Sequence, residues 1–511
     1  MLQFLTNLTP EISLALGLSA LLVWSSIVSI SGSEGILNGS NNSIQIGNNS
    51  VRVGWIVRSL SIGLLSIILI MLIQGLTNIN IEGKYLESRF EGITCDTMSQ
   101  VLKLMMVVST IGCLVVVSTS GNKVTNSTTP AAALEYPLLR LLALLGMMIL
   151  VSADDLMVFY LALELQSLAL YVLAASARGS AYSTEAGLKY FMLGAFASGL
   201  FLLGASLVYG YLGTTNYRII SQLLSTQIES RGLETGFRLM VTAISFKLAA
   251  APFHMWSPDV LEGSPATSGM FFAAVTKIAA LGGLIRRCYG PFYGIWMNSI
   301  GFRPFVIRSA LSRTVGALAS LGQRRMKRFL AYSAIGHMGF RLMGIASGTI
   351  DGLQATLTYL ALYVIGSLGM WSVIVATGTR YMTDLGGLSR RRPGLAMVIA
   401  ISMFSMAGVP PMGGFLAKLS VLFAAMESSM VESMYMLALF SVMISVVGAY
   451  YYLRIIKIMY FGAPNHSSEL NEIDTGSAWI MSISTFITVF VLLNPTLLSI
   501  LVQRATLSMI G

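Results

Sequence analysis

The chain has 511 residues, of which 55% are hydrophobic and only 11% are charged, and its mean hydropathy is +0.75. A soluble domain carries about 25% charged residues, so this composition excludes a soluble globular protein and predicts one that crosses a membrane many times. The net charge of +10 does not indicate nucleic-acid binding, because the basic residues gather in short loops and do not line one soluble face.

Hydropathy divides the chain into about fourteen apolar stretches, and a helix needs about 20 such residues to cross a bilayer. We therefore expect an all-α polytopic membrane protein with about 14 transmembrane helices. The predicted spans lie near residues 11–30, 54–75, 101–118, 134–152, 156–175, 190–210, 238–258, 266–285, 303–321, 329–347, 354–377, 394–426, 434–456 and 477–502. No basic segment precedes the first span, so we expect that helix to be retained and not cleaved as a signal peptide.

Asn, Gly and Ser dominate the segment from Ser31 to Ser50, between the first two predicted spans. This segment is longer and more polar than a turn requires. We expect a loop on the matrix or cytoplasmic side that contacts another subunit.

Four ionisable residues lie in stretches that are otherwise apolar enough to span a membrane: Glu164, Lys247, Lys277 and Lys418. A charge at bilayer depth costs roughly 2.5–3.5 kcal/mol on insertion scales, so a residue retained there is usually functional. Lys247 and Lys277 lie in mid-span, too deep to reach either interface easily. The structural alternatives are pairing of Glu164 with a neighbouring helix and helix capping or snorkelling by Lys418. We favour proton transfer for all four.

Two of the predicted spans contain a helix break. Pro252 follows Lys247 in the seventh span, and Pro410 and Pro411 precede Lys418 in the twelfth. Proline removes a backbone donor, and inside a membrane the freed carbonyls are tolerated only where protein or a water-filled cavity meets them. Broken helices at corresponding places in two halves are typical of inverted-repeat transporters, so each break predicts a hydrated ion path beside a lysine.

The ninth and tenth spans carry further ionisable residues. His337 and Arg341 share a helical face in the tenth span. A neutral imidazole can relay a proton, but a histidine bonded to a neighbouring carbonyl is equally ordinary, so both interpretations stay open. The ninth span contains Arg303, Arg308 and Arg313, whose five-residue steps do not keep them on one face. Either that span begins later, or these arginines contact partners or lipid headgroups.

The basic residues also predict how the chain is threaded. Loops after odd-numbered spans carry roughly fourteen Lys or Arg, against roughly eight on the opposite side. The main groups are 324–328 and 390–392. Because matrix and cytoplasmic loops are rich in basic residues, both termini are expected on the other side. Arg286 and Arg287 are exceptions, since they fall near the less basic loops.

No cofactor motif is evident. Cys95, Cys113 and Cys288 are scattered without CxxC spacing, so neither a disulfide framework nor an iron–sulfur or zinc site is predicted. The nucleotide-binding patterns GxGxxG and GxxxxGK[ST] are absent. We expect no bound cofactor, no metal and no redox chemistry in this chain.

Five segments carry a family resemblance that extends over essentially the whole chain. They are YLALELQSLALYVLAAS, STEAGLKYFMLGAFASGLFLLGASLVYG, FKLAAAPFHMWSPDVLEGSP, KRFLAYSAIGHMGF and MFSMAGVPPMGGFLAKL. In this order and spacing, the chain resembles the family of NADH dehydrogenase subunit 2, or bacterial subunit N, the antiporter-like proton-pumping subunits of respiratory complex I. The motif ELQSLALYVLA separates it from the sister subunits 4 and 5.

The resemblance implies an antiporter-like fold with two inverted five-helix repeats and with helices 7 and 12 broken. On this basis residues 1–130 hold three N-terminal helices with their loops, and residues 131–287 hold the first repeat, helices 4 to 8. Residues 288–460 hold the second repeat, helices 9 to 13. Residues 461–511 hold a loop and helix 14.

The resemblance also implies an order of proton transfer. In that family a glutamate of helix 5 pairs with a lysine of helix 7, and a lysine of helix 8 bridges to the centre of the subunit. A histidine of helix 10 lies on the central hydrophilic axis, and a lysine of helix 12 ends the path. The residues at these positions are Glu164, Lys247, Lys277, His337 and Lys418.

The resemblance further implies a core membrane-arm subunit of a proton-translocating NADH:ubiquinone reductase. NADH, FMN, iron–sulfur clusters and ubiquinone are expected in other subunits. Expected partners are the antiporter-like subunit 4, a small 4L-type neighbour and lipids such as cardiolipin, with no nucleic acid. The expected location is the mitochondrial inner membrane, with both termini facing the intermembrane space, and the alternative is a bacterial plasma membrane.

A different function stays open at this point. Subunits of multi-subunit cation/proton antiporters share the lysines and the broken helices but have no respiratory coupling. A small-molecule carrier and a purely structural scaffold fit less well, because only proton-active residues accompany the breaks.

Overall fold

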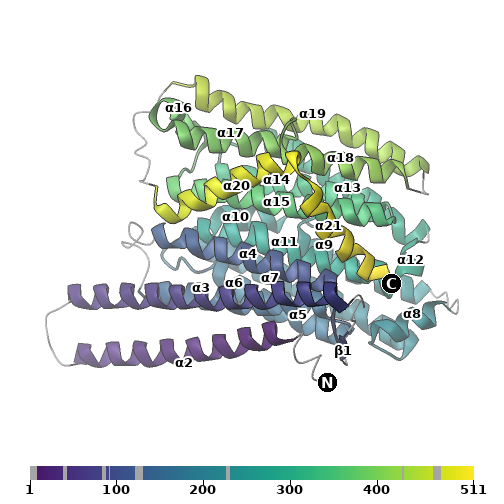
Figure 1. Ribbon diagram of the computed structural model, residues 1–511, viewed down its shortest axis with the longest axis horizontal. Helices are drawn as coiled ribbons and strands as arrows, with labels where there is room; N and C mark the ends of the chain where they lie inside the picture. Colours follow the sequence, from purple (N-terminus) through teal and green to yellow (C-terminus); the bar gives the residue numbers. More distant parts are fainter. Residues whose placement is uncertain are drawn as a thin grey trace.

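The computed structural model describes residues 8–37, 43–82, 88–90, 92–120, 130–225, 231–297, 299–428, 431–463 and 473–510. Within these ranges the chain is a bundle of helices, most of which run roughly alongside one another (Figure 1). One short hairpin pairs β1 (Ser88–Phe90) antiparallel with β2 (Ile93–Cys95). Apart from this hairpin, the prediction of an all-α fold is confirmed.

The helices fall into a longer and a shorter set. The longer helices are α2 (Thr9–Leu37), α3 (Ser43–Glu82), α4 (Thr97–Ser120), α5 (Pro130–Ser152), α6 (Leu156–Ala174), α7 (Ala181–Leu212), α9 (Arg231–Leu248), α11 (Ala266–Tyr289), α13 (Ser299–Leu321), α14 (Met326–Ala346), α15 (Ile350–Thr377), α17 (Pro393–Ala407), α18 (Gly413–Met426), α19 (Val431–Phe461), α20 (Thr475–Leu493) and α21 (Thr496–Ile510). The shorter ones are α8 (Tyr217–Ser225), α10 (Trp256–Gly263), α12 (Tyr293–Met297), η1 (Met382–Leu385) and α16 (Leu388–Arg391).

Ten of the described helices are long and apolar enough to cross a membrane. Every predicted span overlaps a helix or a helix pair, but four of the fourteen are not among these ten. Two of the four are the broken pairs α9–α10 and α17–α18, and the other two are α13 and α14, which carry several basic residues. The count of fourteen spans therefore stays a prediction.

Two boundaries differ from the sequence prediction. The expected polar loop from Ser31 to Ser50 is largely helical, since α2 continues to Leu37 and α3 begins at Ser43. Asn, Ser and Gly lower helix propensity by less than about 1 kcal/mol each, which is too little to end a helix at the edge of its apolar part. The last predicted span, 477–502, is divided at Pro495, which lacks the N–H needed to continue α20.

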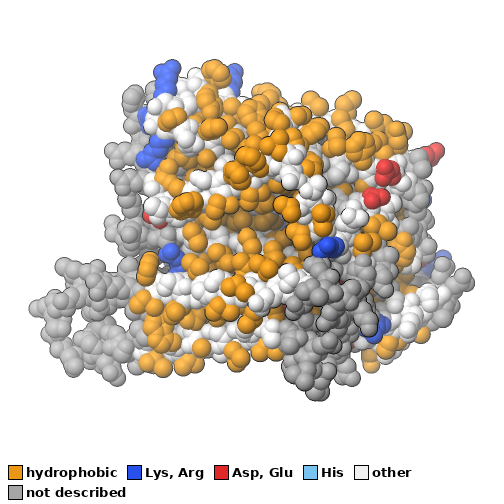
Figure 2. Space-filling model, in the orientation of Figure 1, with side chains coloured by type: hydrophobic (Ala, Val, Ile, Leu, Met, Phe, Trp, Pro, Cys, Tyr) orange, Lys and Arg blue, Asp and Glu red, His pale blue; other side chains and the backbone are white. Residues whose placement is uncertain are grey.

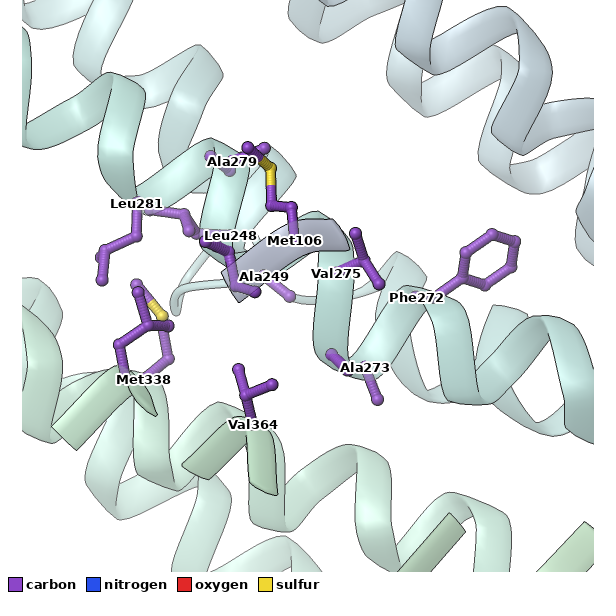
Figure 3. Packing of buried hydrophobic residues seen from close by; sticks show 14 of the residues in the cluster. Met106, Leu248, Ala249, Phe272, Ala273, Val275, Ala279, Leu281, Met338 and Val364 are labelled. Carbon is purple, nitrogen blue, oxygen red and sulfur yellow. The ribbon is translucent and has the colours of Figure 1, made fainter. Parts of the chain in front are cut away.

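The centre of the bundle is formed by α11 and α15. The apolar part of α11 is buried along its whole length, and α15 contacts α4, α11, α14, α17, α18 and α20. Figure 3 shows side chains from several of these helices meeting near the end of α9, including Met106, Leu248, Val275, Met338 and Val364. The N-terminal helices α2 and α3 lie at one edge of the molecule, and α19 lies at the opposite edge (Figure 1).

The outside of the bundle is apolar. Hydrophobic side chains cover most of the described surface in Figure 2, and charged side chains are sparse. Methionines and aromatic residues of α19, such as Met436, Met443 and Tyr450, are among the most exposed. Such a surface suits contact with lipid or with neighbouring subunits.

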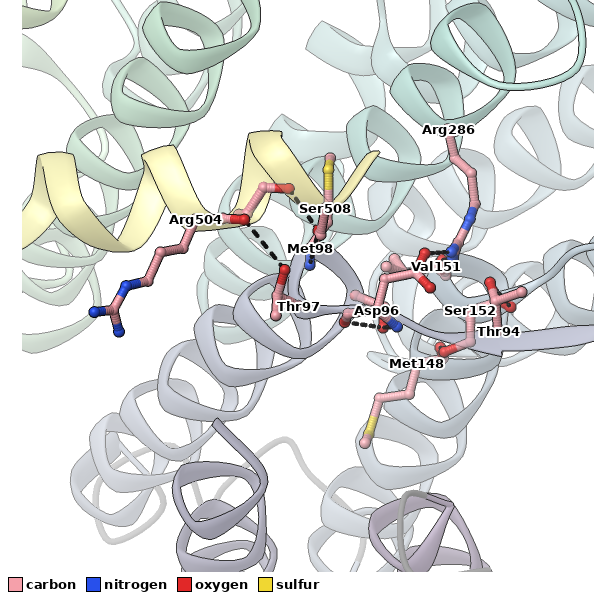
Figure 4. A network of polar contacts seen from close by, with 12 residues as sticks. Thr94, Asp96, Thr97, Met98, Met148, Val151, Ser152, Arg286, Arg504 and Ser508 are labelled. Atoms are coloured by element: carbon pink, nitrogen blue, oxygen red, sulfur yellow. Dashed lines mark hydrogen bonds and ion pairs between the residues drawn. The ribbon is translucent and has the colours of Figure 1, made fainter. Parts of the chain in front are cut away.

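A polar network ties the hairpin region to four helices (Figure 4). Arg286 of α11 pairs with Asp96 and donates to the Val151 carbonyl of α5. Thr97 at the start of α4 donates to the Arg504 carbonyl of α21 at 3.2 Å. Arg286 is therefore an interior anchor, which explains why a basic residue occurs near the less basic loops.

Arg287 is also directed into the protein. Its Nε donates to the Tyr217 hydroxyl at 2.9 Å, and its guanidinium lies 3.0 Å from the centre of the Phe159 ring. This contact holds the short helix α8 against α6. Neither exception to the charge pattern is thus a loop residue facing water.

Candidate functional site

Both predicted helix breaks are present. The chain leaves helical geometry between α9 and α10, and again between α17 and α18. Each break contains a cis peptide bond, at Ala251–Pro252 and at Pro410–Pro411. The last carbonyls of a half-helix have no intrahelical partner, so α9 and α17 each present free acceptors inside the bundle.

Lysines bind these acceptors. Lys277 of α11 donates to the Leu248 carbonyl at 2.8 Å. Lys418 of α18 donates to the carbonyls of Met406 at 2.9 Å and Ala407 at 2.6 Å. The negative end of a helix dipole favours a cation, so both ammonium groups lie where the two half-helices stabilise positive charge.

A glycine makes room for Lys418. Gly408 ends α17 with φ +81°, a left-handed conformation that favours glycine. A Cβ at this position would lie 2.7 Å from Cδ of Lys418. The turn therefore brings the α17 carbonyls and the lysine side chain together.

The capping contact predicted as an alternative for Lys418 is real, but it does not exclude proton transfer. A protonated lysine has three N–H donors, and loss of one proton leaves two. Two donors still satisfy the carbonyls of Met406 and Ala407. Lys418 can therefore gain and lose a proton without giving up its position.

Glu164 and Lys247 do not form the direct ion pair that the resemblance implies. Lys247 Nζ donates instead to the Tyr171 hydroxyl at 3.2 Å. Glu164 is half-buried on α6 and accepts from Ser167 Oγ at 3.3 Å through Oε2, while its buried Oε1 has no partner among the described residues. The carboxylate still acts electrostatically on Lys247. The expected direct pairing is therefore wrong for this structure: each of the two residues instead has its own hydroxyl partner on α6.

His337 lies between two tyrosines. Its Nδ1 is 2.7 Å from the Tyr359 hydroxyl, and its Nε2 is 3.1 Å from the Tyr452 hydroxyl. Tyr452 in turn contacts Ser333 of the same helix as the histidine. A neutral imidazole has one donor and one acceptor nitrogen, so one tyrosine must donate and the other must accept. The carbonyl contact considered as the structural alternative is thus not the one formed: among the described residues, both ring nitrogens face hydroxyl groups.

A small cavity connects His337 with Lys418. It has a volume of about 30 Å³, and its lining includes His337, Lys418, Arg313, Tyr451 and Tyr452. A cavity needs about 10–15 Å³ on this measure to hold one water, so the space suffices for a water beside the polar side chains.

Three of the four arginines in the ninth and tenth spans are buried. Arg313 and Arg308 are buried, which contradicts both the later helix start and the lipid-headgroup contact expected for them. Arg313 lies 3.6 Å from the Phe340 ring centre and donates to the Ser441 carbonyl. Arg303 is exposed. Arg308 and Arg313 lie where neighbouring helices cover α13, whereas Ile307, Leu311 and Leu318 on the same helix are exposed.

Arg341 shares a face with His337, as predicted. Its Nε donates to the His337 carbonyl at 3.3 Å, and its guanidinium lies 4.3 Å from the Tyr363 ring centre. Arg341 is within electrostatic range of both Lys277 and His337. It supplies a fixed positive charge next to His337, and it pairs with no carboxylate within 4 Å among the residues that the structure describes.

The predicted residues thus form two groups. Glu164 and Lys247 each contact a hydroxyl of α6, while His337 and Lys418 share a cavity. Lys277 lies at the α9 break, and within the described parts of the chain no hydrogen-bonded series joins it to His337. The sequence analysis missed the hydroxyls of Ser167, Tyr171, Tyr359 and Tyr452, although the spacing of Glu164, Ser167 and Tyr171 on one helical face was a usable signal.

The family model described as NADH:quinone oxidoreductase/Mrp antiporter, TM, matches residues 153–448. A subunit named NADH-quinone oxidoreductase subunit N 1 from Rhizobium meliloti (strain 1021) is 46% identical over 339 residues, covering 65% of this chain and 69% of the relative. NADH-quinone oxidoreductase subunit N from Beijerinckia indica subsp. indica is 40% identical over 417 residues, covering 79% of this chain and 82% of the relative.

Solved structures agree on the fold. A chain of respiratory complex I from Thermus thermophilus has a TM-score of 0.76 at 26% identity, covering 96% of this chain and 98% of the other. A chain of the Mrp complex from Dietzia sp. DQ12-45-1b has a TM-score of 0.81 at 19% identity, covering 99% and 98%. The second likeness concerns the fold alone.

The two broken helices, each with a lysine inside the bundle, and the matched fold define an antiporter-like membrane subunit. The identities of 46% and 40% to the two bacterial relatives assign the chain to one family within this class. The chain belongs to the family of NADH-quinone oxidoreductase subunit N.

Proposed function

We propose that the chain is a membrane-arm subunit of a respiratory NADH-quinone oxidoreductase and translocates protons, driven by quinone reduction in other subunits. The observation that carries this proposal is the placement of Lys277 and Lys418 on the free carbonyls of two broken helices. Its relatives are named as subunits of that enzyme. NADH, FMN, iron–sulfur clusters and ubiquinone would then belong to neighbouring subunits.

The path that we propose runs from Glu164 through Lys247, Lys277 and His337 to Lys418. An ionised Glu164 stabilises the buried Lys247 ammonium, whereas a neutral Glu164 leaves only the cost of burial. The proton then moves on to Lys277 and the α9 break. Because interacting sites share their titration, each step changes the charge that the next site experiences.

The step between Lys277 and His337 depends on water. Apolar side chains, among them Leu248 and Met338, meet near the α9 break (Figure 3), and among the described residues no direct hydrogen bond joins Lys277 to His337. The fixed charge of Arg341 disfavours a second cation nearby, so a proton arriving at Lys277 passes on more readily when His337 is neutral.

We also propose the partners and the location. An antiporter-like subunit 4, a small 4L-type neighbour and an anionic lipid such as cardiolipin would contact this chain. We favour the mitochondrial inner membrane with both termini towards the intermembrane space, with the bacterial plasma membrane as the alternative. Two contacts bring loops with basic residues together at one end of the bundle, which supports a common basic face there. The backbones of Arg325 and Tyr381 form a β-bridge, and the Arg454 side chain donates to the Leu321 carbonyl.

The proposal is tested by replacing Lys247 and Lys277 together with methionine in the assembled complex. Quinone reduction and proton uptake would be measured in proteoliposomes. The expected result is a loss of translocated protons per electron, with Lys457→Met as a control outside the path. Wild-type stoichiometry and rate in the double variant would overturn the proposal.

A further inference from the structure

The small cavity beside His337 and Lys418 lies between α13, α14, α17, α18 and α19. Its wall contains two basic side chains, Arg313 of α13 and Lys418 of α18. Arg313 is only 2% exposed, and Lys418 is partly buried. Two groups that carry positive charge therefore border one enclosed space.

Both basic groups lie over the ring of Phe340, which also lines the cavity. The guanidinium carbon of Arg313 is 3.6 Å from the ring centre, and Nζ of Lys418 is 5.5 Å from it. The face of an aromatic ring attracts a cation, but it carries no net charge that could balance two. Arg313 and a protonated Lys418 are thus neighbours that repel each other more strongly here than they would in water.

No carboxylate balances this charge among the residues that the structure describes. No Asp or Glu oxygen there lies within 4.0 Å of a side-chain nitrogen of Arg313 or Lys418. Arg341, on the same helix as His337, adds a third positive charge nearby. Burying charges without a partner is costly, so the cluster favours a negative ion as its partner.

Each of the two basic groups also has a hydrogen-bond donor left over. Arg313 donates through Nη2 to the Ser441 carbonyl, whereas its buried Nη1 has no partner among the described residues. The Lys418 ammonium has three N–H donors, and two of them bind the carbonyls of Met406 and Ala407. One N–H of each group is therefore available to an anion.

The size of the cavity limits which anion fits. Its volume of about 30 Å³ exceeds the roughly 10–15 Å³ that one water requires, which leaves room for a single small ion. Gly336 and Gly448 line this space without side chains. A Cβ on Gly448 would lie 3.5 Å from the Tyr451 hydroxyl, an ordinary contact, so a methyl group there would narrow the cavity without a clash.

We propose that the cavity binds one small monovalent inorganic anion, such as chloride, between Arg313 and Lys418. The anion accepts hydrogen bonds from Nη1 of Arg313 and from the third N–H of Lys418. A water molecule fits the same space, but it brings no charge and leaves both cations unbalanced. A bound anion stabilises the Lys418 ammonium, which makes the protonation of this lysine depend on the halide concentration. Anion binding requires no proton translocation, so the site can be tested separately from the proposed function.

Anomalous X-ray diffraction from crystals of the assembled complex soaked in bromide tests the site. A bromide peak is expected in the cavity, within hydrogen-bond distance of Lys418 Nζ and Arg313 Nη1, and an excess of chloride should remove it. Arg313→Met should lose the peak because it removes a charge. Gly448→Ala should lose it because a methyl group takes the space, although every charge is kept. Arg303→Met removes an exposed cation from the same helix and should keep the peak.

A measurement in solution accompanies the crystals. Exchanging gluconate for chloride at constant ionic strength should raise the thermal midpoint of the wild-type complex and of Arg303→Met, but not that of Gly448→Ala. No bromide peak in the wild-type cavity, or a peak retained in both Arg313→Met and Gly448→Ala, would overturn the proposal. A carboxylate of a neighbouring subunit between the two cations would do the same. If Arg313→Met does not assemble, Gly448→Ala decides the question alone.

Discussion

The contact between Lys418 and the end of α17 yields a quantitative prediction about local stability. Lys418→Met removes both donors and leaves the carbonyls of Met406 and Ala407 buried without partners. An unsatisfied buried group costs about 1–3 kcal/mol, so two cost about 2–6 kcal/mol. Lys277→Met frees only the Leu248 carbonyl and costs about half as much.

Hydrogen–deuterium exchange of the assembled complex measures this difference. A tenfold change corresponds to about 1.4 kcal/mol, so the lower bound for Lys418→Met is a roughly thirtyfold faster exchange. The amides concerned are those that close the α17 end, Gly408 and Val409, both bonded to the Phe404 carbonyl. Lys277→Met should accelerate exchange at the α9 break about fivefold at its own lower bound, and should leave the α17 end unchanged.

The neighbouring residue provides a control. Leu419→Met changes a partly exposed side chain on the same helix and should leave exchange unaltered. If Lys418→Met exchanges like the wild type at Gly408 and Val409, the lysine does not stabilise the end of α17, and our reasoning about the break is refuted.

Two further predictions concern stability. Burial lowers the pKa of Lys327, at the start of α14, to about 8, helped by Arg380 and opposed by Glu262. The unfolded state then binds more protons than the folded state between about pH 8 and 10.4, so the free energy of unfolding should rise over this range by at most about 3 kcal/mol. The thermal midpoint of the complex should rise with it, and Lys327→Gln should flatten the rise. A wild-type pH profile in that variant would contradict this prediction. A Cβ on Gly204 would lie 2.6 Å from the Gly236 carbonyl, where α7 crosses α9. Gly204→Ala should therefore destabilise the folded subunit by roughly 1–3 kcal/mol, as overpacking of a core does, and lower the yield of assembled complex. Gly199→Ala, with open space on the same helix, is the control, and equal yields would show that the crossing tolerates a methyl group.

The helix breaks and their lysines could be predicted from the sequence because their signals are local. A proline in an apolar stretch interrupts a helix wherever its neighbours lie, and an ionisable residue at that depth is costly in any fold. Pro252, Pro410 and Pro411 therefore marked both breaks. The sequence indicated that Lys277 and Lys418 lie inside the bundle, and the structure buries Lys277 fully and Lys418 partly, although their carbonyl partners could not be predicted.

The contacts between helices could not be predicted, because they depend on how each helix is rotated. Arg308 and Arg313 suggested a disturbed span, yet neighbouring helices cover both side chains. Tyr171 was one tyrosine among many in apolar helices. Only the position of α9 relative to α6 reveals that the Tyr171 hydroxyl, and not Glu164, contacts Lys247.

The most direct test of the proton path compares Lys277→Arg with Lys277→Met by counting protons translocated per electron in proteoliposomes. Arginine keeps the positive charge and a donor for the Leu248 carbonyl, but it does not release a proton under physiological conditions. If Lys277 passes protons on, both variants should show the same decrease in the number of protons translocated per electron. Wild-type stoichiometry in Lys277→Arg would show that only the charge matters, and would contradict proton transfer through this residue.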